Sequence, residues 1–151
     1  MELFKSLVVF ATTFIIMEFM AWFTHKYVMH GFLWSLHKDH HNQNLKTSWW
    51  ERNDLFFVFY AVISMSFFYS QVELGFIYGF AVGFGIMAYG LTYFIVHDIF
   101  IHQRFKILRN ASNWYAKGIR KAHKMHHANL KKDGGESFGM LFPPIKYFKE
   151  K

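Results

Sequence analysis

The stretch that decides the fold of this chain lies at residues 75–96 and reads GFIYGFAVGFGIMAYGLTYFIV. It contains no charged side chain, which is rare in a helix of a soluble domain over such a length. A helix that crosses about 30 Å of hydrocarbon needs about 20 consecutive apolar residues. The stretch therefore predicts a membrane span, and a set of buried helices in a soluble protein is the disfavoured alternative.

Two further apolar stretches, at residues 3–23 and 53–73, predict two more spans. The first carries the carboxyl group of Glu18, and we expect an ionisable group inside a span to face protein or a water-filled cavity. No small-x-small cleavage site follows it, so a span is favoured over a secretory signal. We therefore predict an all-α integral membrane helical bundle, a single domain over residues 1–151, with about three spans and four as the alternative.

The charge of the chain indicates how it lies in the membrane. Its formal net charge is +7, and it is 53% hydrophobic and 22% aromatic, which excludes a disordered protein. Four of the 17 Lys and Arg residues lie between the first two predicted spans and twelve follow the third. Because Lys and Arg mark cytoplasmic loops, we expect a multi-pass protein of the cytoplasmic (inner) membrane with these segments in the cytoplasm. No nucleic-acid-binding motif accompanies the basic residues, so a nucleic-acid partner is not expected.

The chain contains 10 His and no Cys, and every His belongs to one of four short motifs within residues 25–41 and 97–127. HxxxxH followed by HxxHH occurs after the first span, and the same pair occurs after the third. The ten residues are His25, His30, His37, His40, His41, His97, His102, His123, His126 and His127. With three spans, both pairs fall on the cytoplasmic side as a histidine-rich helical cap. Ten imidazoles are too many for one ion, which takes about four to six ligands, so we predict that they bind two metals.

The spacing of the His residues sets an expectation for their geometry. On a helix, positions i, i+3 and i+4 share one face, so we expect His37, His40 and His41 to converge on one point, and the second HxxHH motif to do the same. The two His of HxxxxH are about 140° apart on a regular α-helix. They reach one site only if the helix ends between them, or if they serve two metals. For the first motif, we expect helix irregularity near Gly31.

Two other features are candidates for parts of the site. Asp98, Asp39 and Asn129 are candidates for groups that orient the His rings, because a metal-bound His usually donates its second ring N–H to a carboxylate or carbonyl. For the two Asp residues, a solvated surface charge is the alternative. Residues 137–148 read SFGMLFPPIKYF, and we predict that this apolar, aromatic, Pro-broken segment lies at the membrane interface near the site as a cover or anchor.

These motifs and the residues that flank them resemble the membrane fatty-acid hydroxylase and sterol-desaturase superfamily of histidine-box di-iron oxygenases, and within it the branch of the bacterial carotenoid hydroxylases. The matching blocks are HKYVMHG (25–31), HKDHH (37–41), NDL (53–55), YGLTYFIVHDIFIHQR (89–104), AHKMHHA (122–128) and SFGMLFPP (137–144). The His motifs are specific only for the superfamily, whereas VHDIFIHQR and the SFG segment indicate the branch. The resemblance extends over nearly the whole chain.

The resemblance implies an O2-dependent non-haem di-iron monooxygenase whose catalytic group is the di-iron centre itself, with the ten His as iron ligands. It implies insertion of one oxygen atom of O2 at C3 of β-ionone rings, so that β-carotene becomes β-cryptoxanthin and then zeaxanthin. The implied partners are a carotenoid substrate from the bilayer, the lipid membrane and an external electron donor of ferredoxin type. The chain has no ExxH motif, so the carboxylate-rich di-iron site of helix bundles is not available to it.

Two other functions stay open at this point. A fatty-acyl or sterol hydroxylase or desaturase of the same superfamily would carry the same His motifs. A His-rich membrane metal transporter would need ligands or charges at mid-membrane, where Glu18 is the only internal candidate. HExxH is absent, which disfavours a zinc protease.

Overall fold

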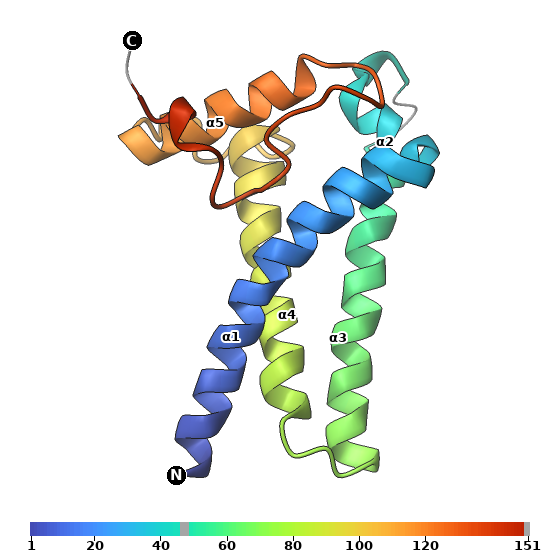
Figure 1. Ribbon diagram of the computed structural model, residues 1–151, viewed down its shortest axis with the longest axis vertical. Helices are drawn as coiled ribbons and strands as arrows, with labels where there is room; N and C mark the ends of the chain where they lie inside the picture. The colour runs from blue at the N-terminus through green and yellow to red at the C-terminus, as the bar shows by residue number, and fades with distance from the viewer. Residues whose placement is uncertain (46–48, 150–151) are drawn as a thin grey trace.

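The fold is built from helices (Figure 1). The structure is a computed structural model, and it describes residues 1–45 and 49–149. Its helices are α1 (Glu2–Phe23), η1 (Thr24–Phe32), α2 (Trp34–His41), η2 (Gln43–Leu45), η3 (Arg52–Asp54), α3 (Leu55–Glu73), α4 (Gly79–Tyr93), η4 (Phe94–Ile101), α5 (Trp114–His127) and η5 (Ile145–Tyr147). The described residues contain no strand, so the predicted all-α class is confirmed.

Three continuous helical stretches are long and apolar enough to cross a membrane, namely Glu2–Phe32, Arg52–Glu73 and Gly79–Ile101. The predicted bundle of three spans is therefore confirmed. Large apolar side chains such as Phe59 and Leu91 are exposed on its outer surface, as a surface that faces lipid requires. The first and third stretches are longer than the apolar runs, because α1 continues into η1 and α4 continues into η4.

Small residues allow the spans to pack closely. The helix α4 lies against both α1 and α3. A Cβ atom added at Gly79 or Gly83 would clash with α3, so these two glycines permit the close approach of the two helices. The buried core of the bundle consists of Met17, Ile86 and Tyr89.

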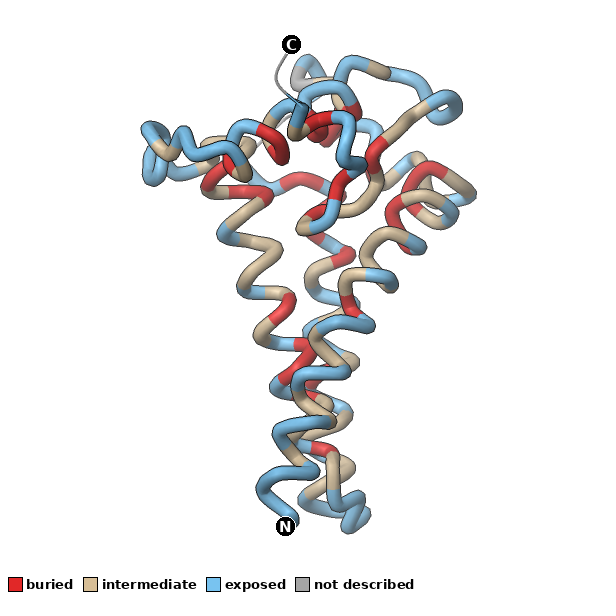
Figure 2. The backbone as a smooth tube through the Cα atoms, turned by 60° about the vertical axis from the view of Figure 1, so that its left-hand side comes forward, coloured by how far each residue is buried: buried red, intermediate tan, exposed pale blue. Residues whose placement is uncertain are grey.

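The remaining elements form a cap on one end of the bundle. The helices α2 and α5 and the segment after α5 lie at the end opposite the N-terminus (Figure 1). Buried residues concentrate at this end, whereas the other end of the bundle is mostly exposed (Figure 2). All four His motifs therefore lie at one end of the bundle, as a chain with three spans requires.

The elements η1 and η4 are π-helices, in which a backbone N–H bonds to the carbonyl five residues earlier instead of four. The N–H of His102 donates to the carbonyl of His97 at 2.8 Å, and that of Leu33 donates to the carbonyl of Val28 at 3.0 Å. At Gly31 the backbone leaves the helical conformation (φ −103°, ψ −126°), so the irregularity expected at this residue is present. The wider turn brings residues five apart in sequence onto the same face.

Candidate metal centre

The ring nitrogens of all ten His converge in two groups of five. Within each group, one ring nitrogen of every residue lies within 4.8 Å of those of the other four. Cluster 1 consists of His25, His30, His37, His41 and His126, and cluster 2 consists of His40, His97, His102, His123 and His127. All five residues of cluster 1 and three of cluster 2 are buried. The structure thus brings together every His that the sequence singled out.

The π-helices explain how each HxxxxH motif reaches a single cluster. His25 and His30 both belong to cluster 1, and their ring centroids are 5.3 Å apart. His97 and His102 both belong to cluster 2, and their ring centroids are 4.5 Å apart. On an α-helix the two rings of such a pair would diverge by about 140°. The i→i+5 turn removes this divergence and resolves the ambiguity that the spacing alone left.

The HxxHH motifs do not converge on one point, so this prediction is wrong. His37 and His41 enter cluster 1, whereas His40 enters cluster 2. At about 100° per residue, His40 lies about 60° to one side of His37 around the helix axis, and His41 lies about 40° to the other side. The rings of His40 and His41 therefore point in different directions. The HxxHH motif of α5 is divided in the opposite sense. His123 and His127 enter cluster 2, and His126 enters cluster 1.

The two clusters are related by the repeat in the sequence. Each contains both His of one HxxxxH motif, the i,i+4 pair of the HxxHH motif that follows it, and one His from the other half of the chain. Cluster 1 receives His126 from α5, and cluster 2 receives His40 from α2. Because of this exchange, neither cluster is complete without both halves of the chain.

The hydrogen bonds of cluster 1 call for a cation among its nitrogen atoms. His30 and His41 donate from Nδ1 to the carbonyl oxygens of Lys132 (2.9 Å) and Asn129 (3.0 Å), which can only accept. The single proton of each neutral ring is therefore on Nδ1, and each Nε2 carries a lone pair. These two Nε2 atoms nevertheless face each other at 3.1 Å. Lone pairs at that distance repel each other unless a positive ion lies between them, so the donor set fits a metal.

In other pairs of rings within the clusters, two Nε2 atoms also face each other at a short distance. The Nε2 atoms of His25 and His37 are 3.1 Å apart, and in cluster 2 those of His40 and His97 are 3.0 Å apart. The Nε2 atom of His126 is buried and has no hydrogen-bond partner among the residues that the structure describes. An all-imidazole set of this kind suits iron, zinc, copper or nickel.

Burial keeps five of the rings outside the spans neutral near pH 7, those of His37, His40, His41, His123 and His126. Desolvation, together with the neighbouring His rings, lowers the pKa of His37, His40 and His123 well below the usual value of 6.5. The same burial lowers the pKa of His41 to about 4 and the pKa of His126 to about 3. A neutral imidazole offers a lone pair, so these side chains can bind a metal ion without first releasing a proton.

Cluster 1 is held from outside by uncharged acceptors. Each of its five rings donates from Nδ1 to an oxygen atom, and four of these atoms are backbone carbonyls of the segment after α5, those of Asn129, Lys132, Glu136 and Phe138. The fifth is Oδ1 of Asn53, which lies 2.7 Å from Nδ1 of His37. The predicted candidate Asn129 thus reaches His41 through its main chain, while its side-chain amide donates to the carbonyl of Asp133.

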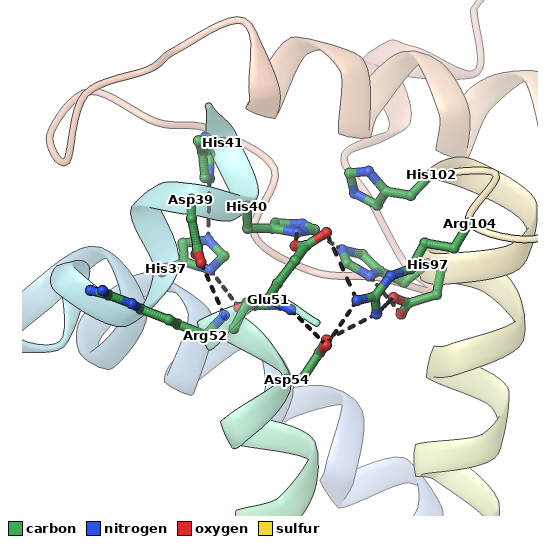
Figure 3. Close-up of polar contacts among 12 residues, drawn as sticks. His37, Asp39, His40, His41, Glu51, Arg52, Asp54, His97, His102 and Arg104 are labelled. Carbon is green, nitrogen blue, oxygen red and sulfur yellow. Dashed lines mark hydrogen bonds and ion pairs between the residues drawn. The ribbon is translucent and has the colours of Figure 1, made fainter. Parts of the chain in front are cut away.

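Cluster 2 is held from outside by carboxylates (Figure 3). Glu51 accepts from Nδ1 of His40 at 2.6 Å, and Asp98 accepts from Nδ1 of His97 at 3.0 Å. Arg104 joins these groups, because it donates to Asp98 at 2.7 Å and to the two carboxylate oxygens of Asp54 at 2.9 and 2.8 Å. The candidate Asp98 therefore orients a His, and the ring that it orients is its own neighbour in the sequence.

The other candidate, Asp39, contacts the backbone and not a His ring. Its carboxylate accepts from the backbone N–H of Arg52 at 3.0 Å. Glu51 and Asn53, which do orient His rings, were not singled out from the sequence. A signal for this turn is present, since Glu51 and Asp54 form a reciprocal capping box at η3. The E-x-x-D spacing just before an apolar run indicates that a helix starts here. This helix start places the side chains of Glu51 and Asn53 beside α2.

Glu18 fastens the C-terminal segment to the bundle. One of its carboxylate oxygens accepts from three consecutive backbone N–H groups at 3.0, 2.9 and 3.2 Å, those of Met140, Leu141 and Phe142. The other oxygen accepts from the hydroxyl of Tyr89 at 2.6 Å. The carboxylate therefore faces protein, as expected inside a span. Because the same segment supplies backbone carbonyls to cluster 1, this contact also supports the site.

Two apolar cavities lead from the surface of the bundle toward the clusters. A groove of about 550 Å³ lies between α3 and α4. A smaller cavity of about 50 Å³ lies deeper, among α1, α3 and α4, and reaches Asn53 and Tyr93. Asn53 contacts a ring of cluster 1 and Tyr93 packs on a ring of cluster 2. Phe57, Tyr60 and Gly90 line both cavities, so the groove and the deeper cavity adjoin each other.

The chain is similar over most of its length to proteins with a known family. Residues 10–148 match the family model described as "Fatty acid hydroxylase". A beta-carotene hydroxylase of Pantoea ananas is 39% identical over 142 residues, which are 94% of this chain and 79% of that protein. A beta-carotene hydroxylase of a Paracoccus species is 33% identical over 96% of this chain and 89% of that protein. The chloroplastic beta-carotene 3-hydroxylase 2 of Arabidopsis thaliana is 30% identical over 95% of this chain and 47% of that protein. No solved structure matches the chain. The chain belongs to the fatty acid hydroxylase family.

Proposed function

We propose that this chain is a membrane carotene hydroxylase, which inserts one oxygen atom of O2 at C3 of the β-ionone rings of β-carotene and forms β-cryptoxanthin and then zeaxanthin. The observation that carries the proposal is the pair of five-histidine clusters at one end of a three-span bundle, in a chain whose bacterial relatives are named beta-carotene hydroxylases. All ten His are the proposed ligands of two non-haem irons. When bound, the irons would supply the redox chemistry with O2, which zinc lacks.

The residues of the chain would position the two irons and keep water away from them. The outer acceptors hold seven of the ten rings in the tautomer with a proton on Nδ1, so that Nε2 points into the cluster. All five residues of cluster 1 are buried and His126 is 0% exposed, so bulk water does not reach the middle of that cluster. In cluster 2, His97 is 1% exposed, whereas His102 and His127 are only partly buried. A dry site limits competing side reactions during an oxygenation.

The groove between α3 and α4 would admit the substrate from the bilayer. A carotenoid is a long, rigid, apolar molecule, so it reaches the protein through the hydrocarbon. The side chains from Phe57 to Phe68 that line the groove extend over about 16 Å of α3, which is about half of the hydrocarbon thickness. A ring that moves inward from this groove arrives between Asn53 and Tyr93, beside both clusters, while the polyene stays between the helices.

The side chain of Tyr60 stands between the groove and the deeper cavity. Its hydroxyl lies 2.6 Å from the hydroxyl of Thr24, and this contact ties α3 to the start of η1. The deeper cavity has room for about one or two water molecules, so the side chains around it must move before a ring can enter. On the opposite wall, a Cβ atom at Gly90 would meet no atom within 4 Å, and this open space marks the path of the ring.

Electrons would enter from the cap. A depression of about 390 Å³ reaches four of the five His of cluster 2 and is bordered by Arg120 and Lys124. Exposed Lys117, Lys121 and Lys124 continue this basic surface along one face of α5. A basic surface attracts an acidic partner, which fits an electron donor of ferredoxin type. The excess of Lys and Arg at this end of the bundle supports an inner-membrane location with the cap in the cytoplasm.

The test is expression of the chain in a bacterium that produces β-carotene and no xanthophylls, together with a ferredoxin and its reductase. We expect cryptoxanthin and zeaxanthin to accumulate only in the presence of O2, and their identity is checked by chromatography and mass spectrometry. The double variant His40→Ala/His126→Ala is the matched control. No conversion with the donor system present would overturn the proposal. Hydroxylated fatty acids or sterols instead would indicate the related substrates, and metal uptake without oxygenation would indicate a transporter.

A further inference from the structure

We infer that the two metal positions are unequal, and that cluster 2 binds its ion more tightly than cluster 1 and favours the more oxidised state of that ion. The inference rests on the proposed function, because it concerns the metals that the clusters would hold. The rings themselves do not distinguish the two positions, since each cluster offers five imidazoles from the same pair of repeated motifs. The difference lies in the groups that accept the outward N–H of each ring.

Around cluster 1 these acceptors carry no charge. Its five rings donate to four main-chain carbonyls and to the amide oxygen of Asn53. Two of the carbonyls belong to residues with charged side chains, Lys132 and Glu136, but those side chains are directed elsewhere. Lys132 is exposed, and the carboxylate of Glu136 pairs with Lys146 at the surface. The carboxylate of Asp133 also acts on His30, but it is exposed and accepts from none of the five rings. The groups that accept directly from the rings of cluster 1 are therefore all uncharged.

Around cluster 2 two of the acceptors are buried carboxylates. Glu51 and Asp98, which accept from His40 and His97, are 4% and 3% exposed. A third buried carboxylate, Asp54, joins them through Arg104 (Figure 3). Among the residues that the structure describes, Arg104 is shared by the three carboxylates, and Arg120 and Lys124 border the cluster at the depression in the cap. The two carboxylates that accept directly from its rings, and not the total charge nearby, therefore distinguish cluster 2.

Negative charge behind a ligand strengthens the bond between that ligand and its metal. A carboxylate that accepts one N–H of an imidazole raises the basicity of the other nitrogen, and loss of such a partner lowers metal affinity by about 10–100-fold. The same charge favours Fe3+ over Fe2+, because the attraction grows with the charge of the ion and is weakly screened in a buried site. We therefore expect cluster 2 to fill first and cluster 1 to have the higher reduction potential.

The first experiment titrates the purified, metal-free full chain in detergent with Co2+ and follows the optical bands of the bound ion. The wild-type chain should show two binding steps. Glu51→Gln and Asp98→Asn each remove one charge and keep an acceptor oxygen, and each should weaken the tighter step by about 10–100-fold and leave the weaker step in place. Asn53→Asp is the reciprocal variant, because it gives His37 a carboxylate partner, and it should strengthen the weaker step.

The second experiment measures reduction potentials of the iron-loaded protein by a titration that is followed by electron paramagnetic resonance. Each tenfold change in the preference for Fe3+ over Fe2+ corresponds to about 59 mV for one electron. Glu51→Gln should therefore raise the lower of the two potentials by at least this amount and bring the two values closer together. Glu73→Gln, which removes an exposed carboxylate at the end of α3, is the charge-matched control and should change neither value.

Two equal binding steps in the wild-type chain would overturn the inference, and so would a Glu51→Gln variant that weakens both steps equally. If Glu51→Gln fails to fold, Asp98→Asn and Asn53→Asp provide the same comparison from separate elements. A chain that binds two ions equally and still hydroxylates carotene refutes only the inequality. A chain that binds no metal and has no activity refutes the proposed function as well, so the two failures are distinguishable.

Discussion

Replacement of Glu18 by Ala should release the C-terminal segment from the bundle. The carboxylate accepts from three backbone N–H groups of that segment and from Tyr89, so the substitution removes the acceptor of four donors. The N–H of Phe142 is on an exposed residue and can turn to water, whereas Met140 is 3% exposed and Leu141 is half-buried. A buried donor that loses its acceptor costs about 1–3 kcal/mol, so two of them favour the released state by about 2–6 kcal/mol.

The assay is limited proteolysis with trypsin, which should cut after Lys146 faster when the segment is released, because the turn of η5 must open before the chain can enter the protease. Where release is fast compared with cleavage, the rate of cleavage follows the released population. At 1.4 kcal/mol for each factor of ten, the lower limit above corresponds to about 30-fold faster cleavage in Glu18→Ala. Glu18→Gln should lie between the variant and the wild type, because its amide oxygen still accepts. Glu73→Ala is the control for a lost carboxylate elsewhere on the bundle.

Release of the segment should also lower the metal content of cluster 1, since Phe138 and Glu136 supply carbonyls to two of its rings. Cluster 2, which is held by Glu51 and Asp98, should keep its ion. Unchanged cleavage in Glu18→Ala would refute the view that the carboxylate fastens the segment. Faster cleavage with full metal content would refute the link between the segment and the site.

Three further predictions follow from the cavities and the clusters. Gly90→Leu fills the space shared by the groove and the deeper cavity, so it should lower turnover at least about tenfold, which corresponds to about 1.4 kcal/mol, without loss of thermal stability. The control is Ala81→Leu on the same helix, which lines a separate depression and should leave turnover unchanged. His126→Ala should abolish turnover and empty cluster 1 while one ion remains, and His40→Ala should do the same for cluster 2; full metal content in both, measured by elemental analysis, would contradict the two-cluster arrangement. The metal-free chain should lose stability in denaturant titrations as the pH falls from 6.5 toward 4. In this range the His rings of the unfolded chain take up protons, whereas buried His41 and His126, with pKa values of about 4 and about 3, do not. A constant stability over this range would contradict the burial of these two rings.

The fold could be predicted because its main signal is local. An uncharged apolar run of about 20 residues has few uses other than a membrane span, and residues 75–96 form such a run. The gathering of the His residues was also predictable, since three spans place both halves of the repeat at the same end. No long-range contact had to be known for either conclusion.

The division of the His residues into two clusters could not be predicted, because it depends on helix geometry that the sequence does not display. The expectation for HxxxxH assumed α-helical turns, and the chain instead adopts π-helices at both motifs. The outer acceptors were missed for a different reason. Four of those around cluster 1 are backbone carbonyls, which every residue possesses, so residue type carries no information about them. Glu51 is brought to His40 by the path of the loop between the first two spans.

The π-helices have a consequence for how this centre tolerates changes in chain length. A π-turn holds one more residue than the α-helical turn it replaces, so the first and third spans each carry a surplus residue near their His motifs. Five residues of a π-helix turn through nearly the same angle as four residues of an α-helix, so the π-turn absorbs the surplus residue without changing the direction of the segment that follows it. Deletion of one residue at positions 99–101 should therefore convert the turn after His97 to an α-helical turn, leave the rings of His97 and His102 on one face, and keep Arg104 directed toward Asp98. The third span thus has room to lose one residue at this place, which a regular stretch of α-helix does not have.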